Sequence, residues 1–455
     1  MSVRNDDRAA HSPTPQTTAL QALSTRRVRR PLTAHVDTTS GERLYRTQTE
    51  LGVQNFPLRG RTFGDLAPFV RNYARVKLAA ARVNHRCGVL DAPRRDAIVA
   101  ACEEIIAGAH ADQFPTPLVH GGGGTTANMN VNEVIATRAS AIGGVVVHAN
   151  DHVNASQSTN DSYPTAMALT VGELVGVPVA ALRELASAFD RKAEEFSDTR
   201  HLGRTCLQDA VSLTAGQTHR GHSAAIRRVA GGLEDAGIAL REVPIGATAV
   251  GTGVGAPDGF GERVAAELAD LTGMPISGVP DRFDALSHLD PYAAIAAAGS
   301  RAAITMAKIA ADLRMLSSGP RGGLGDLSIP AVQAGSSIMP GKVNPVIPEY
   351  VMQLSYRVRG QALTIDCAVA AGELELNVME PVVVDALTTI FDDLTAAAQT
   401  FARRCVDGLA WNGPHRERNL AGALDHWVEM SATEGYENAT TQLRGKAAAN
   451  GGTPS

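Results

Sequence analysis

The sequence predicts a mainly α-helical protein with a long central helical bundle, and three observations lead to that fold class. Aromatic residues make up only 4% of the 455 residues while alanine is abundant, which favours close-packed helices over a β-sandwich. Long stretches repeat apolar residues every three or four positions, which is the helical period. Glycine-rich segments separate these stretches, as expected where the chain must turn between helices.

Five long helical stretches are expected, at 161–196, 214–242, 291–316, 343–370 and 381–410. The third shows the pattern best, because one apolar stripe runs over about seven turns. The stripe consists of Ile295, Ala298, Ala302, Met306, Ile309 and Leu313. Helices of this length exceed the usual mean of about 11–12 residues, so we expect a bundle whose members run most of the height of the molecule.

The length suggests about three domains. Residues 1–40 are polar and aperiodic, so a disordered or loosely attached N-terminal arm is expected there, and the tail from residue 447 is expected to behave in the same way. Between these ends we expect an N-terminal domain over 41–159, a central helical-bundle domain over 160–413, and a C-terminal domain and tail over 414–455.

Composition argues against several classes of function. Lys and Arg total 42 against 47 Asp and Glu, a net charge of −5, which does not fit a nucleic-acid binder or a polybasic membrane module. We find no run of 18 apolar residues, so no bilayer span is expected. The N-terminus lacks the apolar core of a secretory signal.

The cysteines are odd in number and scattered, without a C-x-x-C pair. They are Cys87, Cys102, Cys206, Cys367 and Cys405. A disulfide framework or a zinc site is therefore not expected, and a reducing, cytoplasmic location is.

The sharpest chemical motif is the run 335–345, GSSIMPGKVNP. It places Ser336 in a glycine-flanked loop, with Lys342 six residues later and Asn344 eight residues later. A hydroxyl beside a cation and an amide donor is a candidate for an activated base. The alternative interpretation is a mobile surface loop.

Three further segments gather hydroxyl and amide side chains next to helices. They are 125–134 (TTANMNVNEV), 150–161 (NDHVNASQSTND) and 203–209 (GRTCLQD). Helix starts of this kind hold carboxylates without a formal positive charge. For the first two segments, the alternative is that they only cap their helices.

All four segments resemble the aspartase/fumarase superfamily, in that family's order and approximate spacing. The run GSSIMPGKVNP matches its signature without a substitution, and the resemblance extends from about Leu44 to Glu437. The resemblance implies a homotetrameric, mainly α-helical, three-domain lyase with a central helical bundle. It also implies active sites that are each assembled from three subunits. We expect a cofactor-free enzyme with no metal ligand among its site residues.

The resemblance assigns roles to individual residues. Ser336 takes the place of the catalytic base, while Lys342 and Asn344 take the places that hold substrate carboxylate and stabilise the intermediate. Glu349 occupies the position of a glutamate linked to the active site. The substrate-binding positions correspond to Thr125, Asn128, Ser158, Thr159, Asn160, Thr205, Cys206, Ser337, Lys342 and Asn344.

The implied reaction is anti β-elimination from a small dicarboxylate or amino acid to give fumarate. Removal of a Cβ proton puts a second negative charge on a carboxylate, so the site must supply preorganised donors in a dry pocket. Serine is a poor base unless its alkoxide is stabilised, which the backbone donors of the loop and the nearby lysine can do. Closure of the loop would exclude water.

The leaving group is expected to be ammonia or an amine. The run 158–160 (STN) and the segments 346–349 and 372–381 are aspartase-like, whereas 148–151 (HAND) is closer to class II fumarases. A fumarase-like hydratase acting on malate and fumarate is therefore the alternative. A third interpretation is an inactive scaffold of lyase ancestry, such as a lens crystallin.

Three departures from the family pattern bear on the substrate. Cys206 stands where the family has histidine, Leu51 stands where it commonly has arginine, and the C-terminal domain is expected to be shortened. Loss of two polar groups predicts weak activity on L-aspartate and preference for a succinate with a modified nitrogen substituent. The alternative for Cys206 is a buried, inert thiol.

Overall fold

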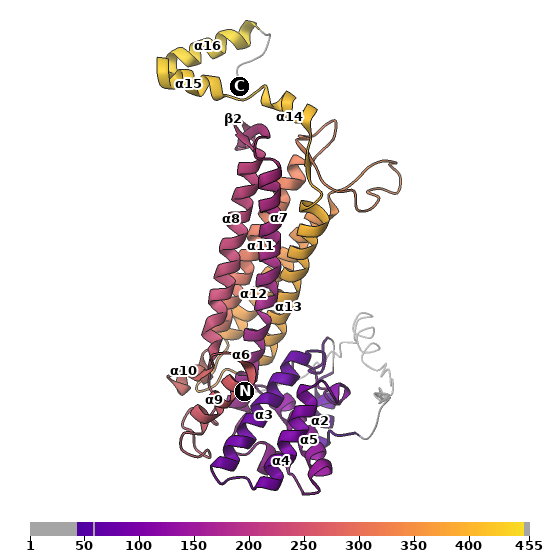
Figure 1. Ribbon diagram of the computed structural model, residues 1–455, viewed down its shortest axis with the longest axis vertical. Coiled ribbons are helices and arrows are strands. Elements are labelled where there is room, and N and C mark those ends of the chain that lie inside the picture. Colours follow the sequence, from indigo (N-terminus) through magenta and orange to yellow (C-terminus); the bar gives the residue numbers. More distant parts are fainter. Residues whose placement is uncertain (1–42, 58–59, 450–455) are drawn as a thin grey trace, which may run out of the picture. The chain divides into compact units, whose positions relative to one another are not determined.

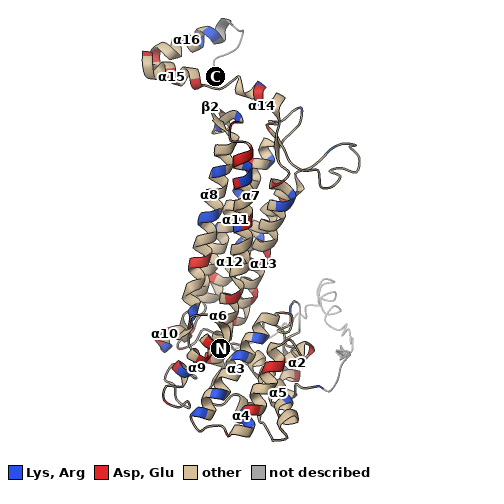
Figure 2. Cartoon of the chain, in the orientation of Figure 1, with Lys and Arg blue, Asp and Glu red and all other residues tan. Residues whose placement is uncertain are grey.

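The computed structural model describes residues 43–57 and 60–449, and the arm expected over residues 1–40 lies outside them. The described chain is mainly helical, which confirms the expected fold class. Charged side chains of both signs are interspersed along its helices (Figure 2).

The first region contains four α-helices and two short helical turns, which pack around a cluster of aromatic side chains. Phe63, Phe69 and Tyr73 lie edge to face or stacked within this cluster, and Tyr163 joins it from the next region. The elements are α2 (Thr47–Asn55), α3 (Ala67–Arg86), α4 (Ala92–Ile106), η1 (Ala111–Gln113), α5 (Thr125–Gly143) and the π-helical turn η2 (Ala149–Val153).

Long helices form the bundle that follows. They are α6 (Thr159–Leu174), α7 (Gly176–Glu195), α8 (Ala215–Gly237), α11 (Asp290–Leu316), α12 (Val346–Val369) and α13 (Glu380–Phe401). Figure 1 shows α7 beside α8 and α11 beside α12, with α13 packed against both α12 and α7. The stripe expected on α11 is buried along its whole length, with every member at most 2% exposed.

Small residues let these helices approach closely. Gly299 of α11 faces α13, and a Cβ atom added there would lie 2.8 Å from Ile390 Cγ2. The neighbouring alanines Ala298, Ala302 and Ala303 of α11 are also buried, as small residues at close helix contacts are expected to be.

Helices α6 and α7 form one nearly continuous helix. The single residue between them, Val175, has helical dihedrals of −59° and −27°. The combined segment Thr159–Glu195 has 37 residues and is long and apolar enough to cross a membrane, but 67% of its apolar window is buried inside the protein. We therefore interpret it as a core helix, about 55 Å long at the usual rise per residue.

Short elements connect the bundle helices. Strands β1 (Arg200–Thr205) and β2 (Gln208–Thr214) form an antiparallel hairpin, β3 (Glu242–Val243) pairs in parallel with β4 (Ser277–Gly278), and β5 (Leu327–Ser328) pairs antiparallel with β6 (Ala410–Trp411). The helical connections are η3 (Ile238–Arg241), α9 (Phe260–Thr272), α10 (Arg282–Ser287) and the π-helical turn η4 (Ala402–Val406).

Three helices follow the bundle: α14 (Gly413–Leu420), α15 (Asp425–Glu434) and α16 (Tyr436–Ala449). The prediction of a loose tail from residue 447 was wrong as far as Ala449, because a run of alanines continues the helix at low entropic cost. Two bundle helices also end earlier than expected. Helix α8 gives way to a 3-10 turn after Gly237, and α13 gives way to a π-helical turn after Phe401.

Candidate active site

The residues expected at the site fall into two groups, and the first surrounds the start of α5. Gly124 precedes this helix with φ +90°, and a Cβ atom there would lie 2.2 Å from Tyr163 Cδ2. Only glycine fits both the left-handed backbone and the ring that packs against it. Thr125 then begins the helix, exposed, with its hydroxyl donating to the Gly122 carbonyl at 2.9 Å.

Helix α2 packs against this end of α5. The Glu133 carboxylate of α5 accepts the backbone N–H groups of Arg46, Gln48 and Thr49 at 2.8 to 3.1 Å, which satisfies donors at the start of α2. Leu51 lies on α2 with 43% of its surface exposed. The position that commonly carries arginine in the family therefore presents an apolar side chain to solvent here.

Asn128 lies one turn into α5 and joins it to the start of α6. Its side chain is buried and donates from Nδ2 to Thr159 Oγ1 at 3.0 Å and to Asn154 Oδ1 at 3.2 Å. Its Oδ1 accepts from the Tyr73 hydroxyl at 2.9 Å and from Lys77 Nζ at 2.8 Å. Two of the expected residues, Asn128 and Thr159, are thus in direct contact.

The start of α6 holds the other members of this group. Ser158 caps the helix, with Oγ accepting the Asn160 backbone N–H at 3.2 Å, while Asn160 Nδ2 donates to the Ala249 carbonyl at 2.8 Å. Asp161 is fully buried and accepts the backbone N–H groups of Ser158, Gly246 and Thr248. Burial raises the pKa of Asp161 to about 6, and these backbone donors oppose that rise.

Lys77 is a member of the cluster that the sequence analysis missed. It is 0% exposed, and its ammonium donates to the amide oxygens of Asn128, Asn154 and Gln157 at 2.8, 2.9 and 3.1 Å. Burial lowers the pKa of Lys77 to about 7. The signal in the sequence was a single lysine inside the apolar run 76–81 (VKLAAA). Apolar residues on both sides of a lysine indicate a buried segment and not the usual surface position of lysine.

The second group begins at the β1–β2 hairpin. Thr205 ends β1, and the two-residue turn that follows consists of Cys206 at φ +52° and Leu207 at φ +64°. Thr205 and Cys206 are both exposed. The alternative of a buried, inert Cys206 thiol was wrong, because the left-handed turn places Cys206 at the exposed tip of the hairpin.

A buried carboxylate anchors this hairpin. Asp326 is 0% exposed and accepts from Arg204 of β1 at 2.5 Å and from Asn419 of α14 at 2.6 Å. Beside the hairpin lies a pocket of about 470 Å³, whose lining includes Thr205, His222 and Lys308. The anchor joins the hairpin to the segment between α11 and α12, and to the helices after the bundle.

The loop with the serine lies in that segment. Ser336 Oγ accepts backbone N–H groups of Ile338 at 3.3 Å and Met339 at 3.1 Å. Asn344 Nδ2 donates to the Gly335 carbonyl at 2.6 Å and closes the loop at its base.

The remaining members of the second group lie beside these residues. Ser337 and Lys342 are exposed. Glu349 lies in the first turn of α12 and pairs with Arg314 of α11 at 3.3 Å.

The two groups lie at opposite ends of a long helix. Ser158, Thr159 and Asn160 stand at its start, whereas the hairpin follows its last residue, about 55 Å away at the usual helical rise. Figure 1 shows β2 and the start of α6 at opposite ends of the bundle. Among the described residues, no hydrogen bond or ion pair joins the serine loop to the residues around Thr159.

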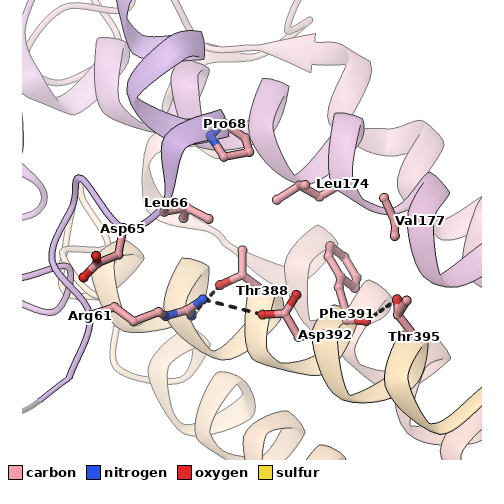
Figure 3. Close-up of a pocket in the computed structure, with 10 residues that line it drawn as sticks. All are labelled: Arg61, Asp65, Leu66, Pro68, Leu174, Val177, Thr388, Phe391, Asp392 and Thr395. Atoms are coloured by element: carbon pink, nitrogen blue, oxygen red, sulfur yellow. Dashed lines mark hydrogen bonds and ion pairs between the residues drawn. The ribbon is translucent and has the colours of Figure 1, made fainter. Parts of the chain in front are cut away.

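A separate pocket lies where α13 meets the junction of α6 and α7. Arg61 spans it, donating to Thr388 at 2.7 Å and pairing with Asp392 at 3.8 Å (Figure 3). None of its ten lining residues, all of them in the described part of the chain, belongs to either group. It is therefore not part of the expected site.

Known proteins resemble this chain over most of its length. The model of a lyase family matches residues 38–360. Aspartate ammonia-lyase of Escherichia coli strain K12 is 40% identical over 375 residues, which cover 81% of this chain and 78% of that enzyme. Class II fumarate hydratase of Ralstonia nicotianae is 42% identical over 386 residues, covering 83% of this chain and 82% of that protein.

The fold has a counterpart among solved structures as well. The structure of fumarate lyase:delta crystallin from Brucella melitensis bound to cobalt is 39% identical, with a TM-score of 0.86, and the match covers 90% of this chain and 91% of that one. The motifs, the helical bundle and these relatives agree, and the chain belongs to the aspartase/fumarase superfamily of lyases.

Proposed function

We propose that this protein is a carbon–nitrogen lyase that eliminates ammonia or a modified amine from an aspartate-like substrate to give fumarate. Ser336 takes the Cβ proton, and the electron pair of that C–H bond passes into an aci-carboxylate. The pair then forms the double bond as the Cα–N bond breaks, and the amine leaves with the electrons of that bond.

The observation that carries this proposal is the environment of Ser336 Oγ. Two backbone N–H groups, from Ile338 and Met339, point at this oxygen. Each of these donors stabilises negative charge on the oxygen, so together they ease formation of the alkoxide during proton transfer. The exposed Lys342 on the same loop adds a cation that can move toward the charge when substrate arrives.

We propose further that each active site combines residues from several chains of a homotetramer. One chain supplies Ser336 and Lys342, another supplies the donors at the starts of α5 and α6, and a third supplies Thr205 and Cys206. The separation of these groups along the helix Thr159–Glu195 supports this arrangement, because one chain cannot close a gap of about 55 Å. The substrate is a small dicarboxylate or amino acid.

The nitrogen substituent of the substrate is proposed to differ from a plain amine. Cys206 is exposed at the hairpin tip and offers only a weak donor, while Leu51 presents an apolar surface on α2. Both positions carry strong polar groups in the family pattern. A site that has lost them should bind L-aspartate weakly and tolerate a substituent that needs fewer hydrogen bonds.

A second candidate is hydration of fumarate to malate. The 42% identity to the class II fumarate hydratase of Ralstonia nicotianae supports it, since the identity to aspartate ammonia-lyases is no higher. The two reactions differ only in whether water or an amine leaves from Cα.

One experiment tests these proposals. The purified protein is incubated with L-aspartate and, separately, with L-malate, and fumarate is followed by its ultraviolet absorbance. In the reverse direction, fumarate is mixed with a panel of amines and the products are identified by mass. Faster elimination from an amino substrate, or an amine adduct of fumarate, supports the lyase, whereas turnover of malate alone supports the hydratase.

Two variants serve as controls. Ser336→Ala should lose about 10²- to 10⁴-fold in kcat, the usual contribution of a positioned base. Ser328→Ala removes an exposed hydroxyl eight residues earlier and should keep wild-type activity. Full activity in Ser336→Ala would contradict the assignment of the base, and no turnover by the wild-type protein would support the inactive scaffold.

A further inference from the structure

We propose that Lys77 is a positioning residue that makes the Thr159 hydroxyl a donor toward the substrate carboxylate. The inference rests on the proposed function, because it concerns the same site. In this inference, Lys77 determines which atom is donor and which is acceptor in the series of hydrogen bonds from Lys77 through Asn128 to Thr159.

The series of hydrogen bonds starts at the Lys77 ammonium, which acts only as a hydrogen-bond donor. An ammonium carries three N–H donors and no acceptor. Its three hydrogen-bond partners within the described part of the chain are all amide oxygens, those of Asn128, Asn154 and Gln157. The ammonium therefore fixes which end of each amide faces it.

Asn128 passes this direction on. Its oxygen faces Lys77 and the Tyr73 hydroxyl, so its NH₂ group must face the opposite side. There it donates to Asn154 Oδ1 and to Thr159 Oγ1. The oxygen and both N–H groups of this buried amide are thus all hydrogen-bonded to other residues of the protein. No donor or acceptor of Asn128 remains for direct contact with substrate. We therefore place Asn128 behind the binding surface.

Thr159 is where the chain of hydrogen bonds reaches solvent. Its side chain is partly exposed, and its Oγ1 accepts from Asn128. Among the hydrogen bonds of residues 43–57 and 60–449, none has the Thr159 hydroxyl as donor. Its single proton is therefore available to an incoming oxygen. If Asn128 were turned by 180°, Thr159 would donate to the amide oxygen and would meet a carboxylate with its lone pairs.

The burial of Lys77 supports a role for its hydrogen bonds in orienting Asn128. Placing an ammonium at a site with 0% exposure is costly, and burial lowers its pKa to about 7 although the nearby Asp161 carboxylate opposes that shift. Methionine would fill the same space without that penalty. A costly group that the packing does not need is best explained by its hydrogen bonds.

The test uses substitutions that keep shape and change hydrogen bonding. Lys77→Met removes the donor, Thr159→Val removes the hydroxyl, and Asn128→Asp replaces the amide by a group that only accepts. Lys192→Met is the matched control, because Lys192 is also buried but lies near the end of α7, paired with Glu195. KM and kcat are measured for the substrate that the wild-type protein turns over fastest.

Each variant has an expected result. Thr159→Val and Lys77→Met should raise KM about 10- to 100-fold, the usual effect of losing one hydrogen bond to a charged group. The value of kcat should change little, since the bond exists in both the bound state and the transition state. The double variant should be no worse than Thr159→Val alone, and Lys192→Met should keep the wild-type KM.

Asn128→Asp separates positioning from structural support. It gives the buried ammonium a carboxylate partner and loses the bond that Asn128 donates to Asn154, so the thermal unfolding midpoint should stay close to that of the wild type. Its KM should nevertheless rise, because Thr159 must then donate to the new carboxylate. An unchanged KM in Asn128→Asp or Lys77→Met, or additive effects in the double variant, would overturn the inference.

Failure of the proposed function and failure of this inference give different experimental results. If the wild-type protein releases no fumarate from any substrate, the proposed function fails, and calorimetric binding of succinate to the same variants replaces KM. Succinate bound by the wild type and about 10-fold more weakly by Lys77→Met would uphold the role of Lys77. Equal binding to both, or no binding to the wild type, would overturn it.

Discussion

Activity restored by mixing two inactive variants is the sharpest consequence of the separation between the two groups of residues. Ser336→Ala removes the proposed base at one end of the bundle. Asn160→Asp adds a carboxylate at the start of α6, at the other end. Repulsion between that carboxylate and a substrate carboxylate about 4 Å away amounts to about 4 kcal/mol at an effective dielectric constant near 20, or about a thousandfold in activity. Each variant alone should therefore be nearly inactive.

Hybrid tetramers should recover part of the activity. If a site takes its serine loop from one chain and its α6 start from another, each of these parts is intact with a probability of one half in an equal mixture. About a quarter of the sites then carry neither lesion, so the mixture should reach about a quarter of wild-type activity. The two proteins are coexpressed or refolded together, and fumarate release is measured at saturating substrate.

A matched mixture gives the control. Ser336→Ala combined with Lys342→Ala places both lesions on one loop, so every loop is defective and no activity should return. If the first mixture is no more active than its separate components, the site is built within one chain and the reasoning from helix length is refuted.

Three further predictions follow from single positions. Gly124→Ala should lower the free energy of unfolding by about 1–3 kcal/mol in urea denaturation, because its Cβ meets the Tyr163 ring from a left-handed backbone. Burial lowers the pKa of His222 from 6.5 to about 4. As the pH falls from 6.5 to 4, His222 is therefore protonated in the unfolded chain but still neutral in the folded chain, which destabilises the folded state. The unfolding free energy of the wild type relative to His222→Leu should therefore fall by about 3 kcal/mol between about pH 7 and pH 4. Cys206→His should raise kcat/KM for L-aspartate at least about 10-fold in the fumarate assay, since it returns a strong donor to the hairpin tip.

The fold was largely predictable from the sequence because the helices are long. Over α11 the apolar period repeats through many turns, and Ile295, Met306 and Leu313 all lie in the core as expected. Helix ends were less predictable. Only local hydrogen bonds decide whether α13 stops at Phe401 or continues, and those depend on neighbours that a single sequence does not reveal.

Motifs in the sequence were enough to name the expected site residues. They did not predict the neighbours or the burial of these residues. Lys77 escaped notice because a lysine is normally exposed, and only the amide side chains around it explain its burial. Cys206 was given a buried alternative from the general behaviour of cysteine, which ignores the turn in which it stands. The separation of Thr159 from Thr205 was implicit in the sequence, since one long apolar stretch lies between them.

The near-continuous helix from Thr159 to Glu195 limits how this protein can change over evolutionary time. Deleting one residue within it would rotate everything downstream by about 100° and draw it back by about 1.5 Å, which would misalign Arg204 of the hairpin with Asp326. Insertions and deletions should therefore be rare along this segment. Substitutions in the loops beyond its two ends, such as the turn that holds Cys206, would leave this spacing unchanged.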